Sequence, residues 1–282
     1  MRFSQVDVFT DTPTRGNALA VVHDADDLNE AAMQAFARWT NLSETTFLLR
    51  PTDPAADYRV RIFTTGGELP FAGHPTLGSA HAWLAAGGTP HTPGVVIQEC
   101  GAGLVTVGSR GGQRLAFAAP PLRRSGPVEP ELATRIVAAV GLDPGAVRGL
   151  AWCDNGPGWV GVDVESAEAV LAADPDPVAM TDLKVGLIGP YAAADVPRVG
   201  AAYEVRAFYA QGRDFAEDPV TGSLNAALAQ WLIPLGRLPR SYVASQGTKL
   251  HRTGRIHVEA TENAIWIGGD TVTVITGDVD LD

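Results

Sequence analysis

Residues 71–80 read FAGHPTLGSA and residues 215–224 read FAEDPVTGSL. The two stretches share Phe, Ala, Pro, Gly and Ser in one frame, and each continues into a segment rich in Ala and Leu that contains a Trp-Leu pair. Upstream, Arg61-Ile62-Phe63 matches Arg206-Ala207-Phe208. A duplication explains all three matches, whereas two helices that share a capping loop by chance would explain only the loops. The sequence therefore predicts two halves built on the same plan.

The repeated loop has the composition of a helix start. Pro75 and Pro219 suit the first turn of a helix, where a missing N–H group costs nothing. In this frame His74 and Asp218 occupy the cap position, at which Asp is common and His is rare. The first turn of a helix presents free N–H groups and a partial positive charge, which attract a carboxylate. Two such helix starts facing each other would hold a small anion, although either loop alone could be only a cap.

Composition limits the class of protein. The chain has 282 residues, of which 45% are hydrophobic and 19% charged, so it can bury the cores of two domains or of one large domain. The formal net charge of −11 argues against nucleic acid or an anionic membrane surface as a partner. The two cysteines, Cys100 and Cys153, lack metal-type spacing and cannot form a disulfide framework. We expect no metal and a reducing, cytoplasmic environment, because no secretory signal or apolar span is visible.

Periodicity predicts mixed strands and helices along both halves. Residues 3–9 alternate as in a strand, and the residues from Ala31 to Trp39 have helical spacing after an acidic start. Apolar helices are expected after His74 and over residues 219–232. Further predicted segments are strands at 18–22, 45–49, 58–64, 147–153, 159–164, 183–188 and 203–208, and helices at 131–140 and 166–173. Pro120-Pro121 marks a linker between the halves.

A third candidate element is residues 41–47, NLSETTF, between a helix end and the strand that begins at Thr45. Glu44 then lies at a strand entrance, where α/β proteins often place functional side chains. Each candidate also has a structural explanation when taken alone. Glu44 could be a surface carboxylate, His74 a buried structural histidine, and Asp218 an N-cap.

Residues 41–47, 69–78 and 217–223, in this order, resemble the phenazine-biosynthesis PhzF-like family. The opening segments 7–10 and 16–21 and the later Ser245-Gln246-Gly247 also resemble that family, so the similarity covers the whole chain. The resemblance implies an α/β (α+β) fold like diaminopimelate epimerase, with two pseudo-symmetric domains, each a mostly antiparallel sheet curled around a central helix. The domains would be residues 1–119 and 120–270, with a final strand near 271–282 returning to the first. It also implies a site between the domains, a homodimer and no cofactor.

The same resemblance implies roles for individual residues. Glu44 corresponds to the acid/base glutamate, with His74 and Asp218 as its polar partners. Ser43, Gly73, Gly222 and Ser223 fall where the family binds its substrate. The best-known reaction of the family, that of trans-2,3-dihydro-3-hydroxyanthranilate isomerase, moves a proton between carbons of a dihydro-hydroxyanthranilate ring. One carboxylate can do this if it removes a proton from one carbon and returns it to another.

Three functional hypotheses remain open from the sequence. The first is cofactor-free proton-transfer isomerisation of a small carboxylated metabolite. The second is epimerisation or racemisation of an amino-acid-like substrate with Glu44 and Asp218 as opposed bases. Two-thiol epimerisation is disfavoured, because neither repeated loop contains Cys. The third is a non-catalytic binder of an anionic metabolite. Residues 250–255 follow the family pattern loosely, so contacts there that select the substrate are not predicted.

Overall fold

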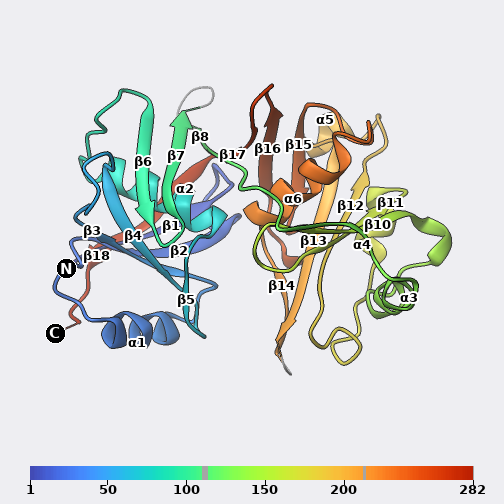
Figure 1. Ribbon diagram of the computed structural model, residues 1–282, viewed down its shortest axis with the longest axis horizontal. Helices are drawn as coiled ribbons and strands as arrows, with labels where there is room; N and C mark the ends of the chain where they lie inside the picture. The colour runs from blue at the N-terminus through green and yellow to red at the C-terminus, as the bar shows by residue number, and fades with distance from the viewer. Residues whose placement is uncertain (110–113, 212–213, 282) are drawn as a thin grey trace. The chain divides into compact units, whose positions relative to one another are not determined.

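The chain divides into two compact units, labelled element by element in Figure 1. The computed structural model describes residues 1–109, 114–211 and 214–281. Unit 1 comprises Met1–Ala118 and Gly268–Asp282, and unit 2 comprises Ala119–Ile267. The division after Ala118 lies just before Pro120-Pro121.

Unit 1 contains a mixed, mainly antiparallel sheet. Its elements are β1 (Arg2–Val8), β2 (Asn17–Val22), α1 (Glu30–Thr40), β3 (Thr45–Leu49), β4 (Tyr58–Phe63), β5 (Glu68–Leu69), α2 (Gly73–Ala85), β6 (Val95–Cys100), β7 (Gly103–Ser109), β8 (Leu115–Ala118) and β18 (Thr271–Asp278). The strands pair in the order β18–β1–β2–β3–β4–β6–β7–β8. The β2–β3 and β4–β6 pairs are parallel, and β5 forms a short antiparallel pair with β4.

Unit 2 repeats this plan. Its elements are β9 (Arg124–Pro127), α3 (Pro130–Ala139), a 3-10 turn (Pro144–Ala146), β10 (Val147–Asp154), β11 (Val160–Val164), α4 (Ala167–Ala172), β12 (Lys184–Pro190), α5 (Val196–Val199), β13 (Tyr203–Gln211), β14 (Asp214–Asp218), α6 (Gly222–Leu232), β15 (Ser241–Gln246), a 3-10 turn (Thr248–Leu250) and β16 (Gly254–Ala260). The division between the units falls within β17 (Ile265–Gly269). The strands pair in the order β9–β10–β11–β12–β13–β15–β16, with β14 beside β13. The β11–β12 and β13–β15 pairs are parallel.

The two units therefore have one topology. In each, a helix (α1 or α4) joins the first parallel pair, and another helix (α2 or α6) joins the second. The outer antiparallel neighbour of β10 is β9, which precedes it in the chain. The corresponding neighbour of β1 is β18, which comes from the opposite end of the sequence. The C-terminal strand thus belongs to unit 1.

The backbone fixes a repeat register that differs from the sequence match. Phe63 lies opposite Glu68 in the β4–β5 ladder, and Phe208 lies opposite Glu217 in the β13–β14 ladder. Helix α2 begins at Gly73 and α6 begins at Gly222, and in both cases three residues lie between the end of the preceding strand and the helix. Gly222 therefore corresponds to Gly73 and not to Gly78, and the predicted register is wrong by five residues.

A close contact supports the corrected register. A Cβ on Gly101 would lie 2.9 Å from the Cα of Pro70, and a Cβ on Gly247 would lie 2.7 Å from the carbonyl oxygen of Pro219. Each glycine directly follows its strand, β6 or β15, and meets the proline that precedes its helix. Pro70 thus corresponds to Pro219.

The predicted capping positions are wrong as well. The N-cap of α2 is Ala72 and that of α6 is Thr221. His74 is therefore the second residue of α2, and Asp218 is the last residue of β14, separated from α6 by a short loop. Neither N-cap side chain bonds its own helix, so both helix starts keep their backbone N–H groups for other partners.

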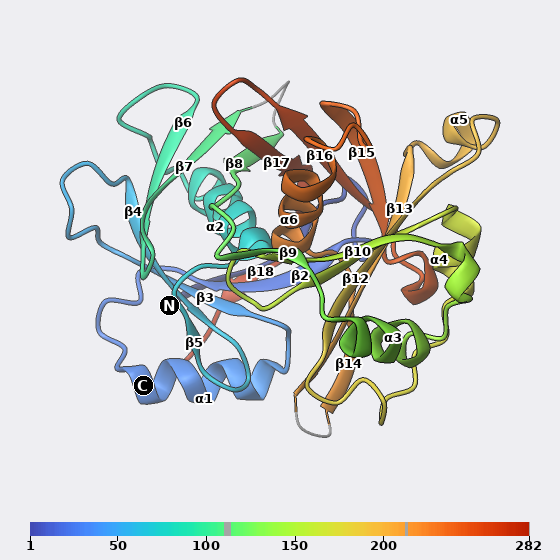
Figure 2. The same cartoon turned by 45° about the vertical axis from the view of Figure 1, so that its right-hand side comes forward.

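Helices α2 and α6 are the central helices of their units (Figure 2). Residues 73–80 of α2 and 224–229 of α6 are all buried, as expected of a helix that is apolar on every side. Helix α1 buries only Met33, Phe36 and Ala37. Strand β3 shows the two faces of the sheet, because Thr46 bonds Ser79 of α2 while Phe47 packs against Phe36 of α1.

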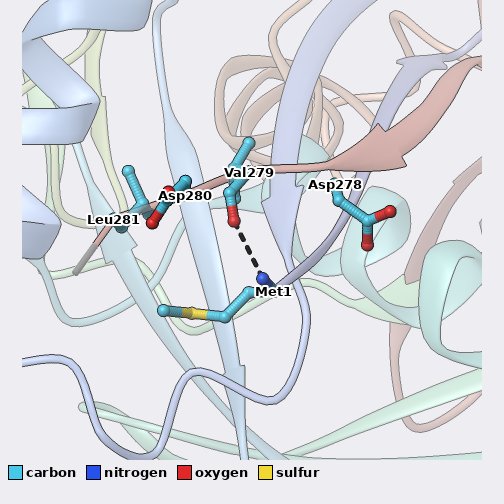
Figure 3. A pocket seen from close by; sticks show the side chains of 5 residues that line it. All are labelled: Met1, Asp278, Val279, Asp280 and Leu281. Atoms are coloured by element: carbon cyan, nitrogen blue, oxygen red, sulfur yellow. Dashed lines mark hydrogen bonds between the residues drawn. The ribbon is translucent and has the colours of Figure 1, made fainter.

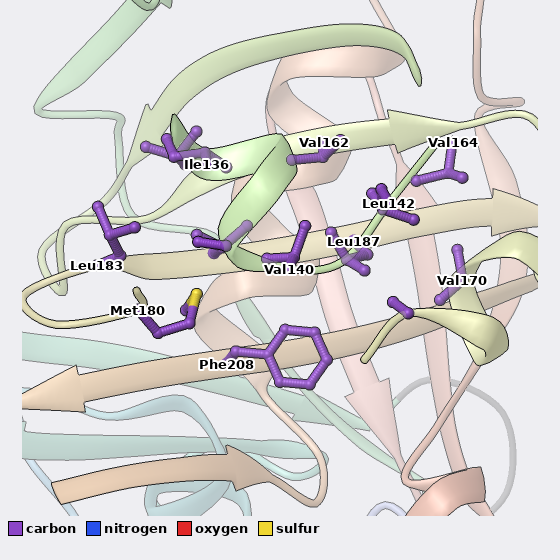
Figure 4. Close-up of a cluster of buried hydrophobic side chains, with 14 of the residues drawn as sticks. Ile136, Val140, Leu142, Val162, Val164, Val170, Met180, Leu183, Leu187 and Phe208 are labelled. Atoms are coloured by element: carbon purple, nitrogen blue, oxygen red, sulfur yellow. The ribbon is translucent and has the colours of Figure 1, made fainter. Parts of the chain in front are cut away.

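The same division holds in unit 2. A hydrophobic cluster on one face of its sheet joins α3 and α4 to β11, β12 and β13 (Figure 4). Val185 and Leu187 of β12 belong to this cluster, whereas a Cβ on Gly186 between them would lie 2.2 Å from Leu224 of α6. The absent side chain lets α6 pack closely on the other face of the sheet.

The two chain ends lie together in unit 1. The amino group of Met1 donates to the carbonyl oxygen of Val279 at 2.8 Å, beside a pocket of about 330 Å³ formed by the terminal residues (Figure 3). Across the described ranges, the helices are too short or too polar to cross a membrane.

Candidate active site

Glu44 and His74 lie together in unit 1. Asn41, in the left-handed conformation at φ 54°, ends α1 and turns the chain toward β3, so Glu44 directly precedes that strand. Its Oε2 atom lies 3.5 Å from Nε2 of His74, and the two side chains are 16% and 6% exposed. The sequence prediction paired these residues, which are 30 positions apart, and the fold brings them into contact.

The imidazole of His74 is neutral at physiological pH. Burial lowers its pKa to about 3, and a hydrogen bond with the backbone of Ala18 opposes this only in part. A neutral imidazole has one N–H donor and one lone pair. The group of His74 that faces Glu44 is therefore polar and uncharged.

Asn17 contacts His74, and Asp7 holds the turn before Asn17; neither was a predicted site residue. The side-chain nitrogen of Asn17 lies 3.4 Å from Nδ1 of His74. Asp7 accepts a 3.0 Å hydrogen bond from the backbone N–H of Gly16, which fixes the turn before Asn17. Both side chains are 2% exposed. Their only signal in the sequence was the opening segment that resembles the family.

In unit 2, Ser223 is the second residue of α6, the position that His74 holds in α2. Its hydroxyl accepts a 3.1 Å hydrogen bond from the indole nitrogen of Trp159, and its carbonyl oxygen accepts from Asn155 at 2.8 Å. Because the oxygen already accepts a hydrogen bond, the hydroxyl proton can be donated to an anion at the helix start. Sequence reasoning missed Trp159 and Asn155, which lie more than 60 positions away.

Asp218 and Glu217, adjacent in the sequence, have different surroundings. Glu217 forms a two-point ion pair with Arg206 at 2.9 and 2.8 Å, with side chains only 5% (Arg206) and 11% (Glu217) exposed. Asp218 instead accepts a 2.6 Å hydrogen bond from the hydroxyl of Thr221. The charge of Glu217 is therefore balanced locally by Arg206, and Asp218 is the carboxylate of the two that lies directly before the loop to α6.

The predicted site residues thus fall into two groups. Glu44, His74 and Gly73 lie in unit 1, and Asp218, Gly222 and Ser223 lie in unit 2. Ser43, the remaining predicted substrate-binding residue, is exposed. Within the described residues, no group of three or more His, Cys, Asp or Glu side chains is arranged to hold a metal ion.

Comparison with known sequences covers almost the whole chain. A family model described as phenazine biosynthesis-like protein matches residues 6–277. Antisense-enhancing sequence 1 of Schizosaccharomyces pombe is 34% identical over 98% of this chain and 97% of that protein. Trans-2,3-dihydro-3-hydroxyanthranilate isomerase of Pseudomonas aeruginosa is 32% identical over 92% of this chain and 90% of that protein. Because relatives named isomerases align along nearly the full length, the chain is an isomerase.

Solved structures establish the fold class. A PhzF-family protein from Enterococcus faecalis superimposes with a TM-score of 0.78 at 24% identity, covering 99% of this chain and 100% of that one. A probable proline racemase from Agrobacterium radiobacter gives a TM-score of 0.58 at 15% identity, covering 100% and 93%. The predicted α+β, epimerase-like fold is confirmed. The resemblance carried by three short motifs is confirmed as well: the chain belongs to the phenazine biosynthesis-like (PhzF) family.

Proposed function

We propose that the protein catalyses cofactor-free proton transfer between carbons of a small carboxylated metabolite, with Glu44 as the acid/base residue. The observation that carries the proposal is the contact between Glu44 and a buried, neutral His74. A half-buried carboxylate beside a neutral hydrogen-bonding partner is an arrangement used for general acid–base catalysis.

The reaction needs no oxidant, reductant or leaving group. Glu44 removes a proton from one carbon of the substrate, and the electrons of that C–H bond form a new C=C bond as the adjacent π bond shifts. Glu44 then returns a proton, which exchanges with solvent while it is on the carboxyl group, to a carbon at the other end of the shifted system. The product is an isomer, in which an enol relaxes to a ketone. His74 stays neutral and supplies a hydrogen bond to Glu44 or to the substrate.

The starts of α2 and α6 support a carboxylated substrate. The first residue of each helix, Gly73 or Gly222, has a backbone N–H group, and the second residue, His74 or Ser223, has a polar side chain. Such groups stabilise a bound carboxylate through hydrogen bonds and the partial positive charge of the helix end. Ser223 adds a hydroxyl whose oxygen is already occupied by Trp159, so that its proton is directed to a ligand.

Asp218 fits a binding role better than that of a second base. The hydroxyl of Thr221 donates to its carboxylate, and such a bond favours the ionised form and weakens it as a proton acceptor from carbon. We assign to Asp218 a hydrogen bond with an N–H or O–H group of the substrate. This assignment argues against the alternative in which Glu44 and Asp218 act as two bases on opposite faces of the substrate in an epimerisation. The proposal also includes a cytoplasmic location and a homodimer, and light scattering after gel filtration would test the homodimer.

Solvent-deuterium incorporation tests the proposal, with trans-2,3-dihydro-3-hydroxyanthranilate as the first substrate because a relative 32% identical is named for it. We expect Glu44→Gln to slow incorporation by about 10²–10⁴-fold, the usual contribution of a positioned acid/base group. The matched control is Glu262→Gln, an exposed glutamate in the turn before β17, which should keep the wild-type rate.

Other outcomes separate the alternatives. Unchanged incorporation in Glu44→Gln would remove Glu44 as the base. If Glu44→Gln still incorporates deuterium into one substrate enantiomer but not into the other, two-base epimerisation would be favoured. Binding of candidate carboxylates without turnover by the wild type would favour the non-catalytic binder.

A further inference from the structure

Gln246, the last residue of β15, holds together the loop between Asp218 and α6. It is fully buried, and its carboxamide makes four hydrogen bonds. The oxygen accepts from the backbone N–H of Thr221 at 3.0 Å and from the side-chain nitrogen of Asn225 at 2.9 Å. The nitrogen donates to the carbonyl oxygen of Asp218 at 3.1 Å and to the hydroxyl of Thr221 at 2.9 Å. Every donor and acceptor position of the carboxamide is used.

Backbone groups fix the orientation of this carboxamide. The N–H of Thr221 can only donate, so it must face the Gln246 oxygen, and the carbonyl of Asp218 can only accept, so it must face the nitrogen. The Thr221 hydroxyl, which lies on the nitrogen side, therefore accepts from Gln246. Its own proton is left to donate to Oδ2 of Asp218, at 2.6 Å.

Unit 1 lacks this arrangement. The close contacts of Gly101 with Pro70 and of Gly247 with Pro219 make Cys100 the counterpart of Gln246. A thiol cannot reproduce the two donors and two acceptors of a carboxamide. Gln98, the other buried glutamine among the described residues, lies two positions before Cys100 on β6, and its side-chain nitrogen donates to the hydroxyl of Thr76 in α2. The Gln246 network is thus specific to the half of the chain that contains Asp218.

We propose that Gln246 is a positioning residue which, by orienting the Thr221 hydroxyl toward Asp218, keeps Asp218 ionised and aimed as a hydrogen-bond acceptor for an N–H or O–H group of the substrate. The proposal rests on the binding role assigned to Asp218 above. It adds a specificity element: substrates must carry a hydrogen-bond donor, such as an amine or a hydroxyl, in addition to the carboxylate.

The direct test is a pH titration of the Asp218 carboxyl, monitored by ¹³C NMR of protein labelled at the aspartate carboxyl carbons. The Asp218 signal is assigned as the one that disappears in Asp218→Asn. Thr221→Val removes the donor while keeping the shape, and Gln246→Met removes the group that orients it. Both should raise the titration midpoint by roughly one pH unit, as expected for a lost hydrogen bond to a charged acceptor. Thr221→Ser, which restores a hydroxyl, should return it to the wild-type value.

Matched controls separate this effect from a general loss of packing. Thr76→Val and Gln98→Met delete a buried glutamine–threonine hydrogen bond of unit 1 and should leave the Asp218 midpoint unchanged. Charged groups on the adjoining segments include the Glu217–Arg206 pair and, on the loop after β15, Arg252, which packs against Gly247. All of these variants keep those three residues. An unchanged midpoint in both Thr221→Val and Gln246→Met would overturn the proposal.

Turnover gives a second, independent readout. Thr221→Val should raise KM by about tenfold with little change in kcat, because the lost bond acts on substrate binding. A substrate analogue that lacks the N–H or O–H donor should lose affinity for the wild type and not for Thr221→Val. Equal losses in kcat in Thr221→Val and Thr221→Ser would contradict a positioning role. If the midpoint shifts as expected but no carboxylate is turned over, the network stands and the proposed isomerase activity fails.

Discussion

The starts of α2 and α6 have the same backbone and different chemistry. Both follow a short strand, a proline and two further loop residues, and both begin with a buried glycine. The second residue of α2 is His74, which faces Glu44, whereas the second residue of α6 is Ser223, bonded by Trp159. Both halves thus have a helix start whose N-cap side chain does not bond the helix, and our proposal places the proton chemistry in only one of them. Conservation of backbone after a duplication therefore does not require shared catalytic roles.

The corresponding arginines of β4 and β13 provide a second comparison. Arg61 pairs with Glu68 and Arg206 pairs with Glu217, and the two pairs occupy matching places in the strand ladders. The Arg61 pair is 23% (Arg61) and 37% (Glu68) exposed, and Glu30 shares its charge. The Arg206 guanidinium is buried and also donates to the carbonyl oxygens of Val170 and Ala173 at the end of α4.

The largest expected difference follows from that burial. Glu217→Gln leaves a buried guanidinium without its counter-charge, and we expect a loss of about 3–5 kcal/mol in the free energy of unfolding. Glu68→Gln, in the more exposed pair, should cost about 1 kcal/mol or less. Urea denaturation of the two variants under identical conditions measures both. Equal losses would mean that the two pairs have diverged less than their exposures indicate.

The next expected effect is a loss of stability in acid that arises from two buried histidines of unit 1. Burial lowers the pKa of His23 to about 4, and the pKa of His74 is lowered to about 3. Both values lie below the ordinary 6.5, so the unfolded chain takes up these protons first. The stabilisation is therefore complete above about pH 6.5 and is lost as pH falls toward 4 and 3. Each histidine should contribute a loss of about 2 kcal/mol between pH 6.5 and 5.

His23→Gln checks this expectation away from the proposed site. Its partner is the hydroxyl of Ser4 at 3.0 Å. The variant should show a shallower fall in unfolding free energy between pH 6.5 and 5 than the wild type, while the exposed His251→Gln should follow the wild type. Parallel curves for all three proteins would contradict the burial argument.

The smallest expected difference tests the corrected repeat register. Gly247 has φ +89°, a conformation that L side chains rarely adopt, whereas its counterpart Gly101 has no such constraint. Both glycines meet the neighbouring proline closely, so alanine should be unfavourable at each. Gly247→Ala should cost about 1–2 kcal/mol more than Gly101→Ala, the cost of left-handed backbone with a Cβ. Thermal denaturation of the pair gives the difference, and a reversed order would argue against matching these positions.

Much of the fold could be predicted because it depends on local patterns. The periodicity of residues 3–9 and the acidic start before Ala31 correspond to β1 and α1. The duplication was also visible, but its register was not. The shared Pro-x-x-Gly-Ser pattern aligned Pro75, inside α2, with Pro219, which lies before α6. Only strand pairing, which joins residues distant in sequence, fixes that register.

The candidate site shows the same limit. Glu44 and His74 were identified from motifs that resemble a family, not from local chemistry. Gln246 was quoted as part of a motif without a role, because its partners Asp218 and Thr221 lie 28 and 25 positions away. Trp159 and Asn155 had no local signal, since a buried donor is recognised only once the acceptor beside it is known.

The most direct test of the account compares the two halves in a single measurement, the exchange of substrate protons with deuterated solvent at saturating substrate. Glu44→Gln should bind substrate with near wild-type affinity and lose exchange by about 10²–10⁴-fold. Asp218→Asn should retain exchange once its raised KM is overcome. Exchange that persists in Glu44→Gln and disappears in Asp218→Asn at saturation would contradict the central claim, because it would place the proton chemistry in unit 2.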